Sequence, residues 1–512
     1  MMNRTTLSFL LGCFVLCLSA RAEDAPAPDF PHTMPVETNQ APLEPSIDEM
    51  KDRFLDPVPY IQTAVYWYWI SGNASCEGIE KDIRAMKSVG IDRAQIGDIG
   101  VDGIERGAIR TFSPQWWEAI HTALKTATEC GVEIGIFNCP GWSQSGGPWI
   151  DSSRTMRYLT GSIQEVSGPD TVTLKYPRRS DEFQDVRVIA FPKPKNARLD
   201  FTIPEGFVAN KGAEAVVEIT PSEPFTARSL TVQTAETPIN GTGRLEAKID
   251  GKYQTIKEFP ISRYNSALDV GFIPYAPVVV SFPAVEADGF RLVVSSDRDG
   301  VGLKSAYLEL APRMDFYPEK TLAKMHQTHH PLWSDYQWPL PTEIDDLKTI
   351  LDPSELKDLT DLIDENKNLR WEVPEGQWLV FWTGMVPTGA KNAPAVPEAT
   401  GYETDKMSRE HIFHHFDSMM GEILRRIPEE DRKSFRIVVQ DSYEVGGQNF
   451  TDGMLRDFAA RYGYDPTPFL PAWFGYVVGD VKTTERFLWD LRRYIADEVA
   501  YSYVGGLRDI SN

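Results

Sequence analysis

Basic residues are scarce in this chain. The 512 residues include 52 Lys and Arg against 74 Asp and Glu, which gives a formal net charge of −22. Binding to nucleic acids requires Lys and Arg to neutralise phosphates, so the composition disfavours a nucleic-acid partner. It equally disfavours attachment to anionic membrane surfaces, which attract polybasic segments. Hydrophobic residues make up 42% of the chain, the proportion of a folded globular protein.

Cysteine is scarce as well, with five residues in the whole chain. Cys13 and Cys17 lie in an N-terminal segment that we expect to be removed, which leaves Cys76, Cys130 and Cys139. Three thiols form at most one disulfide, so we expect no disulfide framework. Two of them flank an expected strand, and we interpret them as thiols of the core.

Long apolar runs are lacking after the N-terminus. The short apolar run Leu7–Leu18, followed by the small-x-small pattern Ala20–Ala22, is typical of a secretory signal and too short for a permanent transmembrane helix. A competing interpretation treats Leu10–Cys13 as a lipoprotein box. We expect residues 1–22 to be a signal peptide and residues 23–55 a Pro-rich linker and lead-in. The mature protein would then be soluble and exported, to the periplasm or the cell exterior.

Aromatic residues, in contrast, are abundant, with 13 Trp, 19 Tyr and 25 Phe. Aromatic faces stack on bases, sugars and apolar ligands. Because bases are disfavoured by the charge, a protein that handles sugars is the first hypothesis.

Residues 56–160 alternate between strand and helix patterns. The segments Ala64–Trp69, Arg93–Ile99 and Val132–Phe137 predict three strands. The segments between them show helical spacing, and Ser113–Pro114 is a typical helix start. This order indicates a parallel sheet or a (β/α) barrel.

Residues 161–345 lose the helical period, which predicts an inserted all-β sandwich module followed by a connector. Its expected strands are Val172–Leu174, Val186–Ala190, Ala215–Ile219, Ser229–Gln233, Val278–Phe282, Phe290–Ser295 and Ala306–Leu310.

The α/β pattern returns in residues 346–512. The expected elements are a helix over residues 353–366, β runs between Trp371 and Trp382, a strand at Phe435–Val439, and helices that start after Ser408, at Thr451 and at Thr483. The last of these helices is amphipathic, and we expect its apolar face to lack a partner within the chain.

The strongest local signal for a site is the pair Asp441 and Glu444, which directly follows an expected strand. Catalytic groups in α/β folds lie at the carboxyl ends of parallel strands. We interpret Glu444 as a general acid or base that Asp441 orients or tunes. The alternative is a helix cap or a solvated acidic loop.

A second signal is the loop Asn138–Trp149, which also follows a strand. Its small residues Ser143, Gly146 and Gly147 would let the backbone approach a ligand, and Trp142 and Trp149 could stack on a sugar ring. A phosphate-binding loop is excluded because no Lys partner and no Gly-Lys-Ser/Thr ending is present. The alternative is a tight loop held by buried tryptophans.

Further candidates follow the first two strands or precede a helix. They are Trp69, Asp98, Asp102, Glu105, Glu403 and Asp405. The acidic ones suit a ligand hydroxyl or a hard cation such as Ca²⁺. Taken singly, each is more often structural.

Two histidine groups lack the His-Glu-x-x-His spacing of zinc sites. They are His326, His329 and His330, and His411, His414 and His415. We interpret them as surface or partly packed side chains. No Gly-x-Ser-x-Gly elbow and no dinucleotide-binding glycine fingerprint is present, which disfavours a serine hydrolase and a Rossmann fold.

Five sequence blocks together resemble the α-L-rhamnosidases of glycoside hydrolase family 106. They are Tyr68–Asn73, Gln95–Asp98, Asn138–Ile150, Gly401–Ser408 and Asp441–Asn449. The resemblance implies a (β/α)8 TIM-type barrel interrupted by β-sandwich modules. It also implies an exo-acting, inverting, calcium-dependent hydrolase that removes terminal α-L-rhamnosyl groups from plant polysaccharides or glycosides.

Carried over by position, the resemblance gives Glu444 the place of the general acid. It places the loop Asn138–Trp149, Asp98 and Asp441 around the sugar, and it assigns no calcium ligands. Inverting hydrolysis needs a second carboxyl group as base, about 6.5–9.5 Å from the acid.

The chain supplies too few strands for a closed barrel, which needs eight. We count strands that end at Trp69, Asp98, Asn138 and Glu444, with residues 378–382 as a possible fifth. Family members are much longer, so we expect this to be the N-terminal part of the enzyme, with the base beyond its end. Two other hypotheses stay open: an inactive sugar-binding protein, and a structural protein of an exported polysaccharide-degrading system.

Overall fold

The computed structural model describes residues 46–55, 62–175, 177, 181–263, 271–324, 338, 342–443 and 446–511. The expected signal peptide, most of the linker, Glu444, and the group His326, His329 and His330 lie outside these residues.

The chain forms two compact units, residues 1–61 and 62–512. The first contributes helix α2 (Ile47–Leu55), whose apolar residues are exposed. No helix within the described ranges is long and apolar enough to cross a membrane.

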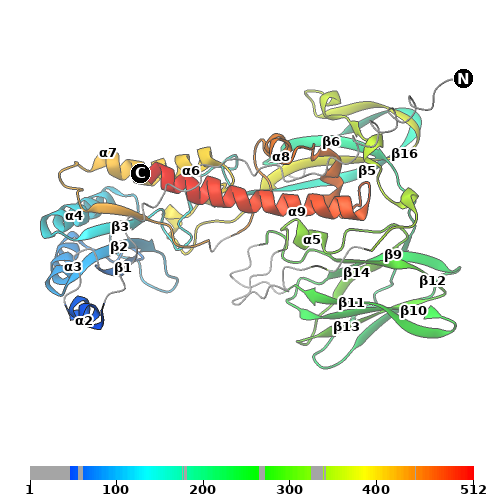
Figure 1. Ribbon diagram of the computed structural model, residues 1–512, viewed down its shortest axis with the longest axis horizontal. Helices are drawn as coiled ribbons and strands as arrows, with labels where there is room; N and C mark the ends of the chain where they lie inside the picture. The colour runs from blue at the N-terminus through cyan, green and yellow to red at the C-terminus, as the bar shows by residue number, and fades with distance from the viewer. Residues whose placement is uncertain are drawn as a thin grey trace, which may run out of the picture. The chain divides into compact units, whose positions relative to one another are not determined.

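Four parallel strands form the sheet on which the site depends (Figure 1). They lie in the order β1-β2-β3-β18, with bounds Thr63–Ile70, Ile91–Ile99, Glu133–Phe137 and Phe435–Val439. All four expected strands are therefore confirmed. The sheet is open in the described part of the chain, and its strand order does not show a closed barrel.

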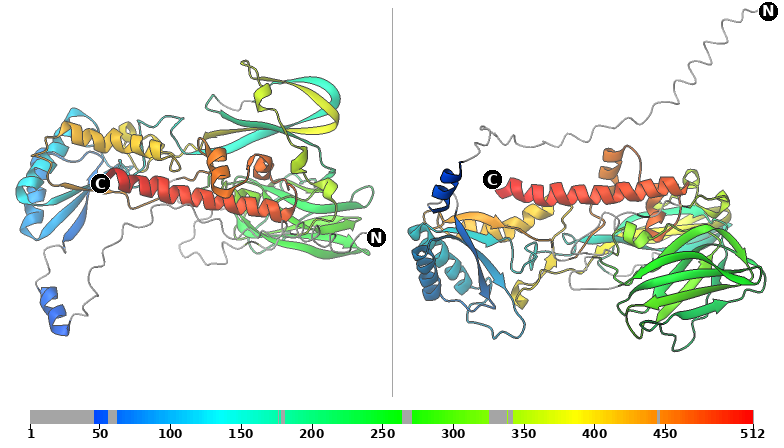
Figure 2. Two further views of the ribbon diagram at one scale, coloured as in Figure 1. Left: turned by 45° about the horizontal axis from the view of Figure 1, so that its top comes forward. Right: turned by 60° about the horizontal axis from the view of Figure 1, so that its bottom comes forward.

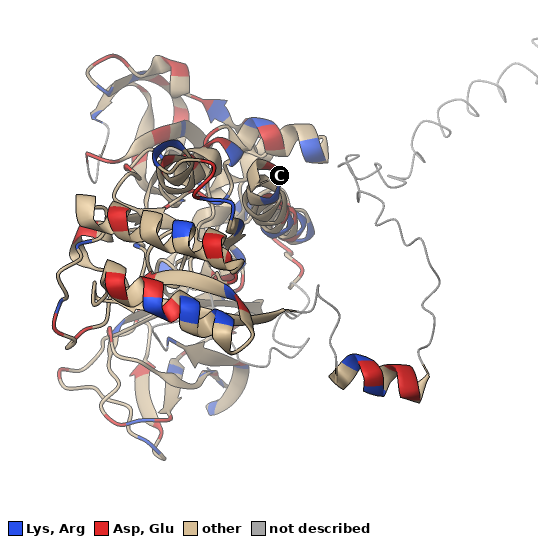
Figure 3. Ribbon diagram, turned by 90° about the vertical axis from the view of Figure 1, so that its left-hand side faces the viewer, with Lys and Arg blue, Asp and Glu red and all other residues tan. Residues whose placement is uncertain are grey.

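Helices α3 (Cys76–Ser88) and α4 (Pro114–Cys130) connect the first three strands. The Ser113 hydroxyl accepts the N–H of Trp116 and caps α4, as expected. Gly131 ends the helix in the left-handed conformation, with φ +67°, which a residue with a side chain rarely adopts. Acidic and basic residues alternate along the ribbons of these helices (Figure 3). Lys81 and Glu77 of α3 form an exposed ion pair.

The two faces of this sheet differ sharply. One face packs against α3, α4 and the helices after residue 408 in a core that includes Trp69, Ile96 and Ile136. The opposite face carries Tyr66 and Tyr68, which are 51% and 40% exposed. Large aromatic side chains thus stand on a sheet face that is only partly covered.

A separate antiparallel sheet follows the parallel one, in the order β15-β6-β16-β5. Its strands are Arg157–Lys175 (β5), Gln184–Pro192 (β6), Lys357–Asp358 (β15) and Asn368–Pro387 (β16). The segment 378–382 pairs with β5 and β6, so our interpretation of it as a fifth barrel strand was wrong. The expected helix over residues 353–366 was also wrong, because only the turns Pro353–Glu355 and Thr360–Leu362 are helical and β15 lies between them.

Two further antiparallel sheets share one apolar core and form a β-sandwich over residues 198–309 (Figure 2). The expected sandwich strands Val172–Leu174 and Val186–Ala190 were placed wrongly, because they are parts of β5 and β6 in the separate sheet. The two sheets of the sandwich have the orders β11-β10-β13-β8 and β12-β9-β14-β7. The strands are Arg198–Asp200 (β7), Ala215–Ile219 (β8), Phe225–Thr234 (β9), Asn240–Ile249 (β10), Lys252–Ser262 (β11), Val278–Ala287 (β12), Phe290–Ser296 (β13) and Leu303–Glu309 (β14). Sequence analysis missed β10 and β11, in which polar residues and glycines dilute the apolar alternation, and the three-residue strand β7.

The C-terminal region is helical. It contains α6 (Arg409–Phe416, capped by Ser408), a π-helical segment (Asp417–Gly421), α7 (Glu422–Arg426), α8 (Met454–Tyr462) and α9 (Val481–Glu498). A further π-helical segment (Val499–Val504) and α10 (Gly505–Ser511) follow. We expected the apolar face of α9 to lack a partner, and this prediction was wrong. Its residues Phe487, Leu491 and Ile495 are buried against Phe458 of α8 and Trp473.

Candidate active site

Asp441, which lies just after β18, contacts two residues that are distant in sequence, Tyr66 in the middle of β1 and Gln144 in the loop after β3. The Tyr66 hydroxyl of β1 donates to Asp441 Oδ2. The Gln144 amide donates to Asp441 Oδ1 over 2.7 Å, and its Oε1 accepts the Asp441 N–H over 2.8 Å. Both carboxylate oxygens are therefore held, while the residue remains exposed to solvent.

Asp441 also changes the pKa of Tyr66. The hydrogen bond to the carboxylate is the main reason why the pKa of Tyr66 is raised to about 12. An ionised phenol could not donate this bond and would repel the carboxylate. The arrangement keeps Tyr66 in its neutral, donating form.

The loop Asn138–Trp149 is fixed by a short antiparallel pairing. Gly146 and Gly147 form β4, which pairs with β17 (Tyr402–Glu403). A Cβ atom on Gly146 would lie 2.8 Å from the Tyr402 carbonyl oxygen, so only glycine permits this approach. Gly146 therefore permits the backbone packing of this loop, and contact of the loop with a ligand stays a prediction.

A buried ion pair contacts this loop through Ser145. Glu403 and Lys406 are completely enclosed, and Lys406 Nζ lies 2.8 Å from Glu403 Oε2. Ser145 also donates to this carboxylate. Burial alone would raise the pKa of Glu403, but the Lys406 ammonium lowers it below its usual value. Charges this deep are maintained only when paired.

Asp405 is held in the same way. Its Oδ2 accepts from Arg157 at 3.0 Å and from Thr451 at 2.6 Å, and its Oδ1 accepts from Gln448 at 2.6 Å. Glu403 and Asp405 thus lie in the interior, where their hydrogen bonds connect the segment 401–408 to Ser145 and Arg157. A direct contact of either carboxylate with a sugar stays a prediction.

The two tryptophans of the loop occupy different environments. Trp142 is 43% exposed and lines an open pocket of about 510 Å³ with Asp102, Lys391 and residues 393–395. Trp149 instead points inward, where its Nε1 donates to His415 Nδ1 over 3.1 Å. Only Trp142 of this pair is free to stack on a ligand in the structure.

His415 corrects another expectation, since it is completely buried rather than a surface or partly packed residue. Burial lowers its pKa to about 4. The side chain is therefore neutral near pH 7 and accepts the Trp149 N–H.

Three other predicted ligand residues lie on the side of the sheet that faces the helices. Trp69, Asp98 and Asn138 are at most 6% exposed. Asp98 Oδ2 accepts from Thr111 at 2.8 Å and from Trp116 Nε1 at 2.9 Å. Burial raises the pKa of Asp98 to about 6, against the effect of these hydrogen bonds. Contact of the three with a sugar also stays a prediction.

Sequence reasoning missed Tyr66, Gln144 and Lys406. Gln144 lies in the loop Asn138–Trp149, but only the fold reveals that it contacts Asp441, which is 297 residues later in the sequence. Alternation along β1 places Tyr66 on the opposite face from Trp67 and Trp69, and this pattern could have identified it.

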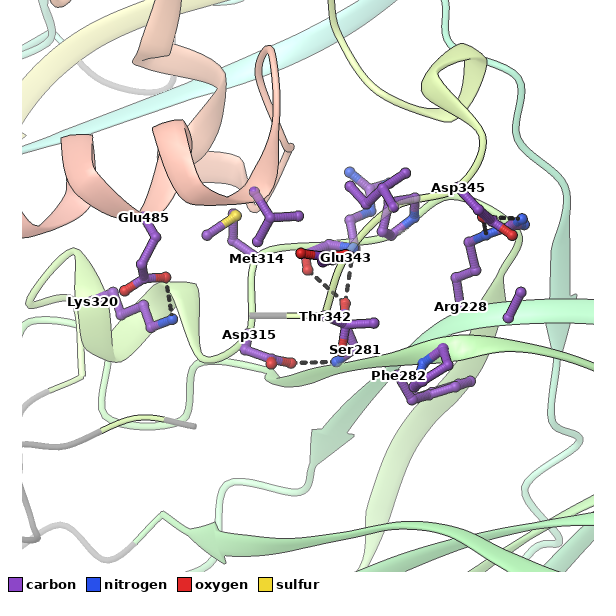
Figure 4. A pocket seen from close by; sticks show the side chains of 16 residues that line it. Arg228, Ser281, Phe282, Met314, Asp315, Lys320, Thr342, Glu343, Asp345 and Glu485 are labelled. Atoms are coloured by element: carbon purple, nitrogen blue, oxygen red, sulfur yellow. Dashed lines mark hydrogen bonds and ion pairs between the residues drawn. The ribbon is translucent and has the colours of Figure 1, made fainter. Parts of the chain in front are cut away.

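A more enclosed pocket lies away from these strand ends, where residues of the β-sandwich meet α9 (Figure 4). It measures about 240 Å³. Its charged groups pair with one another, as in Lys320 with Glu485 at 2.6 Å and Arg228 with Asp345 at 2.8 Å. We therefore place the candidate site at the ends of the parallel strands.

Comparisons with known proteins agree with the resemblance. A protein of Formosa agariphila named "Putative beta-glucuronidase" is 26% identical over 507 residues, which cover 98% of this chain but 32% of that protein. The solved structure of a rhamnosidase from Novosphingobium sp. PP1Y is 28% identical, with a TM-score of 0.74, over 91% of this chain and 46% of that chain. The chain thus spans less than half the length of either protein. Residues 56–512 match the Glyco_hydro_106 family, alpha-L-rhamnosidase, and the chain belongs to glycoside hydrolase family 106.

Proposed function

We propose that this chain is part of a glycoside hydrolase that removes terminal α-L-rhamnosyl groups from plant polysaccharides or glycosides. The family assignment supports a glycosidase, and the similarity to a rhamnosidase over 91% of the chain supports the sugar. The observation that carries the proposal is Asp441, an exposed carboxylate that Tyr66 and Gln144 hold at the carboxyl ends of parallel strands.

In this proposal Glu444 is the general acid that protonates the leaving oxygen. It follows Asp441 by three residues, and a nearby carboxylate disfavours ionisation of an acid, which helps it keep its proton near neutral pH. Both carboxylate oxygens of Asp441 accept hydrogen bonds, so its negative charge has a fixed position. Its backbone N–H is bonded to Gln144, which also fixes the backbone three residues before Glu444. Trp142 offers a face for the sugar or its aglycone.

Inversion requires a second carboxylate, which activates water on the opposite face of the ring. The rhamnosidase structure is more than twice as long as the region matched here. We propose that the base comes from a part of the enzyme outside these 512 residues. The same region would complete a (β/α)8 barrel, whose interior would include the partly exposed face with Tyr66 and Tyr68.

Calcium enters only through the family resemblance. In the described part of the chain no group of three or more His, Cys, Asp or Glu side chains could hold a metal ion. No step proposed for this chain depends on calcium. Export to the periplasm or cell exterior likewise remains a proposal from the N-terminal pattern.

The test is the release of L-rhamnose from an α-L-rhamnosyl disaccharide, with binding measured calorimetrically in parallel. Proton NMR of the first product formed identifies the anomer, and the proposal predicts β-L-rhamnose as the initial product. Binding without turnover would support the sugar-binding alternative for the chain by itself. Turnover of β-glucuronides without rhamnose release would contradict the proposal.

A further inference from the structure

Four polar side chains stand in one row across the carboxyl ends of the parallel strands. The register pairs Trp69 with Asp98, and its continuation through β3 and β18 brings Asn138 and Gln440 level with them. The Asn138 N–H donates to the Val439 carbonyl over 3.1 Å, which confirms this alignment. Residues level with one another in a parallel sheet point to the same face. The four side chains are therefore neighbours.

Each of the four carries at least one buried polar atom without a hydrogen-bond partner among the described residues. These atoms are Trp69 Nε1, Asp98 Oδ1, Asn138 Nδ2, Asn138 Oδ1 and Gln440 Oε1. Buried polar groups in folded proteins are nearly always paired, so five such atoms in one row call for a common explanation. The five atoms belong to residues at the ends of four different strands, so they share a place in the fold and not a place in the sequence.

The chemistry of the row indicates what could pair with it. Side chains level with one another on adjacent strands can bond directly, as Arg93 and Glu133 do in this sheet at 2.6 Å. The five atoms of the row make no such bond among the described residues, which leaves room for a bridging molecule. The Nε1 of Trp69 and the Nδ2 of Asn138 donate, whereas Asp98 Oδ1 and Gln440 Oε1 accept. A bare cation would be repelled by the donors, and an anion by the Asp98 carboxylate. Water both donates and accepts, and it occupies polar interior sites of this kind.

We propose that this row binds a chain of ordered water molecules that bridge the ends of β1, β2, β3 and β18. An open pocket of about 420 Å³ reaches Trp69 and contains Asn73 and Ser75, which gives water a way in at one end. At the other end Gln440 Nε2 donates to the Ser143 carbonyl over 3.2 Å. The waters would thus lie beneath the start of the loop Asn138–Trp149. The proposal is independent of the rhamnosidase activity.

The direct test is a crystal structure of the chain at 1.5 Å resolution or better. We expect water oxygens within about 2.7–3.2 Å of the unpaired atoms of at least two of the four residues. A dry row, side chains rotated to bond one another directly, or a metal ion in the row would each overturn the proposal.

A thermal test uses the sign of a stability change. Asn138→Leu replaces the amide with an apolar group of similar size. If water fills the row, this variant strands the remaining polar groups, and we expect Tm to fall by at least about 2 °C. If the row is dry, the variant removes an unsatisfied amide and Tm rises, which would overturn the proposal.

The matched control is Thr234→Val in the sandwich, because the buried hydroxyl of Thr234 lacks a hydrogen-bond partner among the described residues. We expect this variant to keep or raise Tm, because no polar neighbour depends on that hydroxyl. An Asn138→Leu change equal in sign and size to that of Thr234→Val would contradict a hydrated row. The crystallographic test decides the matter if the Asn138 variant fails to fold.

Discussion

Gln144 binds Asp441 through both ends of its side-chain amide, as acceptor for the backbone N–H and as donor to the carboxylate. Gln144 is itself buried and adopts φ +58°, an uncommon conformation for a residue with a side chain. The fold therefore maintains a strained residue at the place where it orients a carboxylate. We regard Gln144 as a positioning residue for the proposed acid segment.

Replacing Gln144 with Ala should lower kcat/KM for a rhamnosyl disaccharide by about 10–100-fold, because small displacements of a catalytic group have effects of this size. Kinetics with the full-length enzyme would measure it. Gln377→Ala, on an exposed part of the antiparallel sheet, serves as the control and should leave kcat/KM unchanged. An equal effect of the two variants would refute the positioning role.

The bond between Tyr66 and Asp441 predicts a phenol that titrates late. The pKa of Tyr66, raised to about 12 by the carboxylate, should return toward 10 in Asp441→Asn. Because the folded-state pKa is raised, its stabilising effect is complete below pH 10 and is lost as the pH rises through 12. Spectrophotometric titration at alkaline pH, with Tyr66→Phe to identify the signal, measures the change. An identical titration of Tyr66 in both backgrounds would show that the bond does not form in solution.

The buried pair Glu403 and Lys406 predicts a large loss of stability on removal of one partner. Lys406→Met leaves a buried carboxylate without its cation and should lower the free energy of unfolding by about 3–5 kcal/mol. The double variant with Glu403→Gln should recover part of this loss. Urea denaturation measures all three proteins. Lys81→Met, from an exposed pair with Glu77, should change stability by less than about 1 kcal/mol.

The buried, neutral His415 should make the stability of the protein depend on pH. Its pKa is lowered to about 4 by burial, whereas the unfolded value is near 6.5. The stabilising effect of the neutral ring is present above pH 6.5 and is lost as the pH falls toward 4. The decrease in Tm between pH 7 and pH 4 should therefore be smaller in His415→Gln than in the unmodified chain. Parallel decreases in the two proteins would argue against a buried, neutral His415.

The sequence was sufficient for the four parallel strands and for the helix that Ser113 caps. The strands of the sheet, the Ser113 cap and the Asp441 position all follow from periodicity and turn chemistry, which are local properties. The segments 353–366 and 378–382 were misassigned because their structure depends on pairing with β6 and β5, strands more than 150 residues earlier.

The roles of the candidate site residues could be anticipated less well. A loop of small residues before Trp149 fits either ligand approach or tight packing, and only the pairing of β4 with β17 shows the packing function. Glu403 and Asp405 were selected as acids of a loop that precedes a helix. The sequence did not reveal that they pair in the interior with Lys406 and Arg157, and Arg157 lies almost 250 residues away from Asp405.

Glu444 is the proposed general acid of a rhamnosidase. The most direct test of this role compares Glu444→Gln with the unmodified enzyme on two substrates, an α-L-rhamnosyl disaccharide and 4-nitrophenyl α-L-rhamnoside. A sugar is a poor leaving group that needs protonation, so kcat on the disaccharide should fall by about 10²–10⁴-fold. Nitrophenolate leaves without a proton, so its release should fall far less, and Glu410→Gln should affect neither substrate. An unchanged kcat on the disaccharide, or equal losses on both substrates, would contradict the assignment of Glu444.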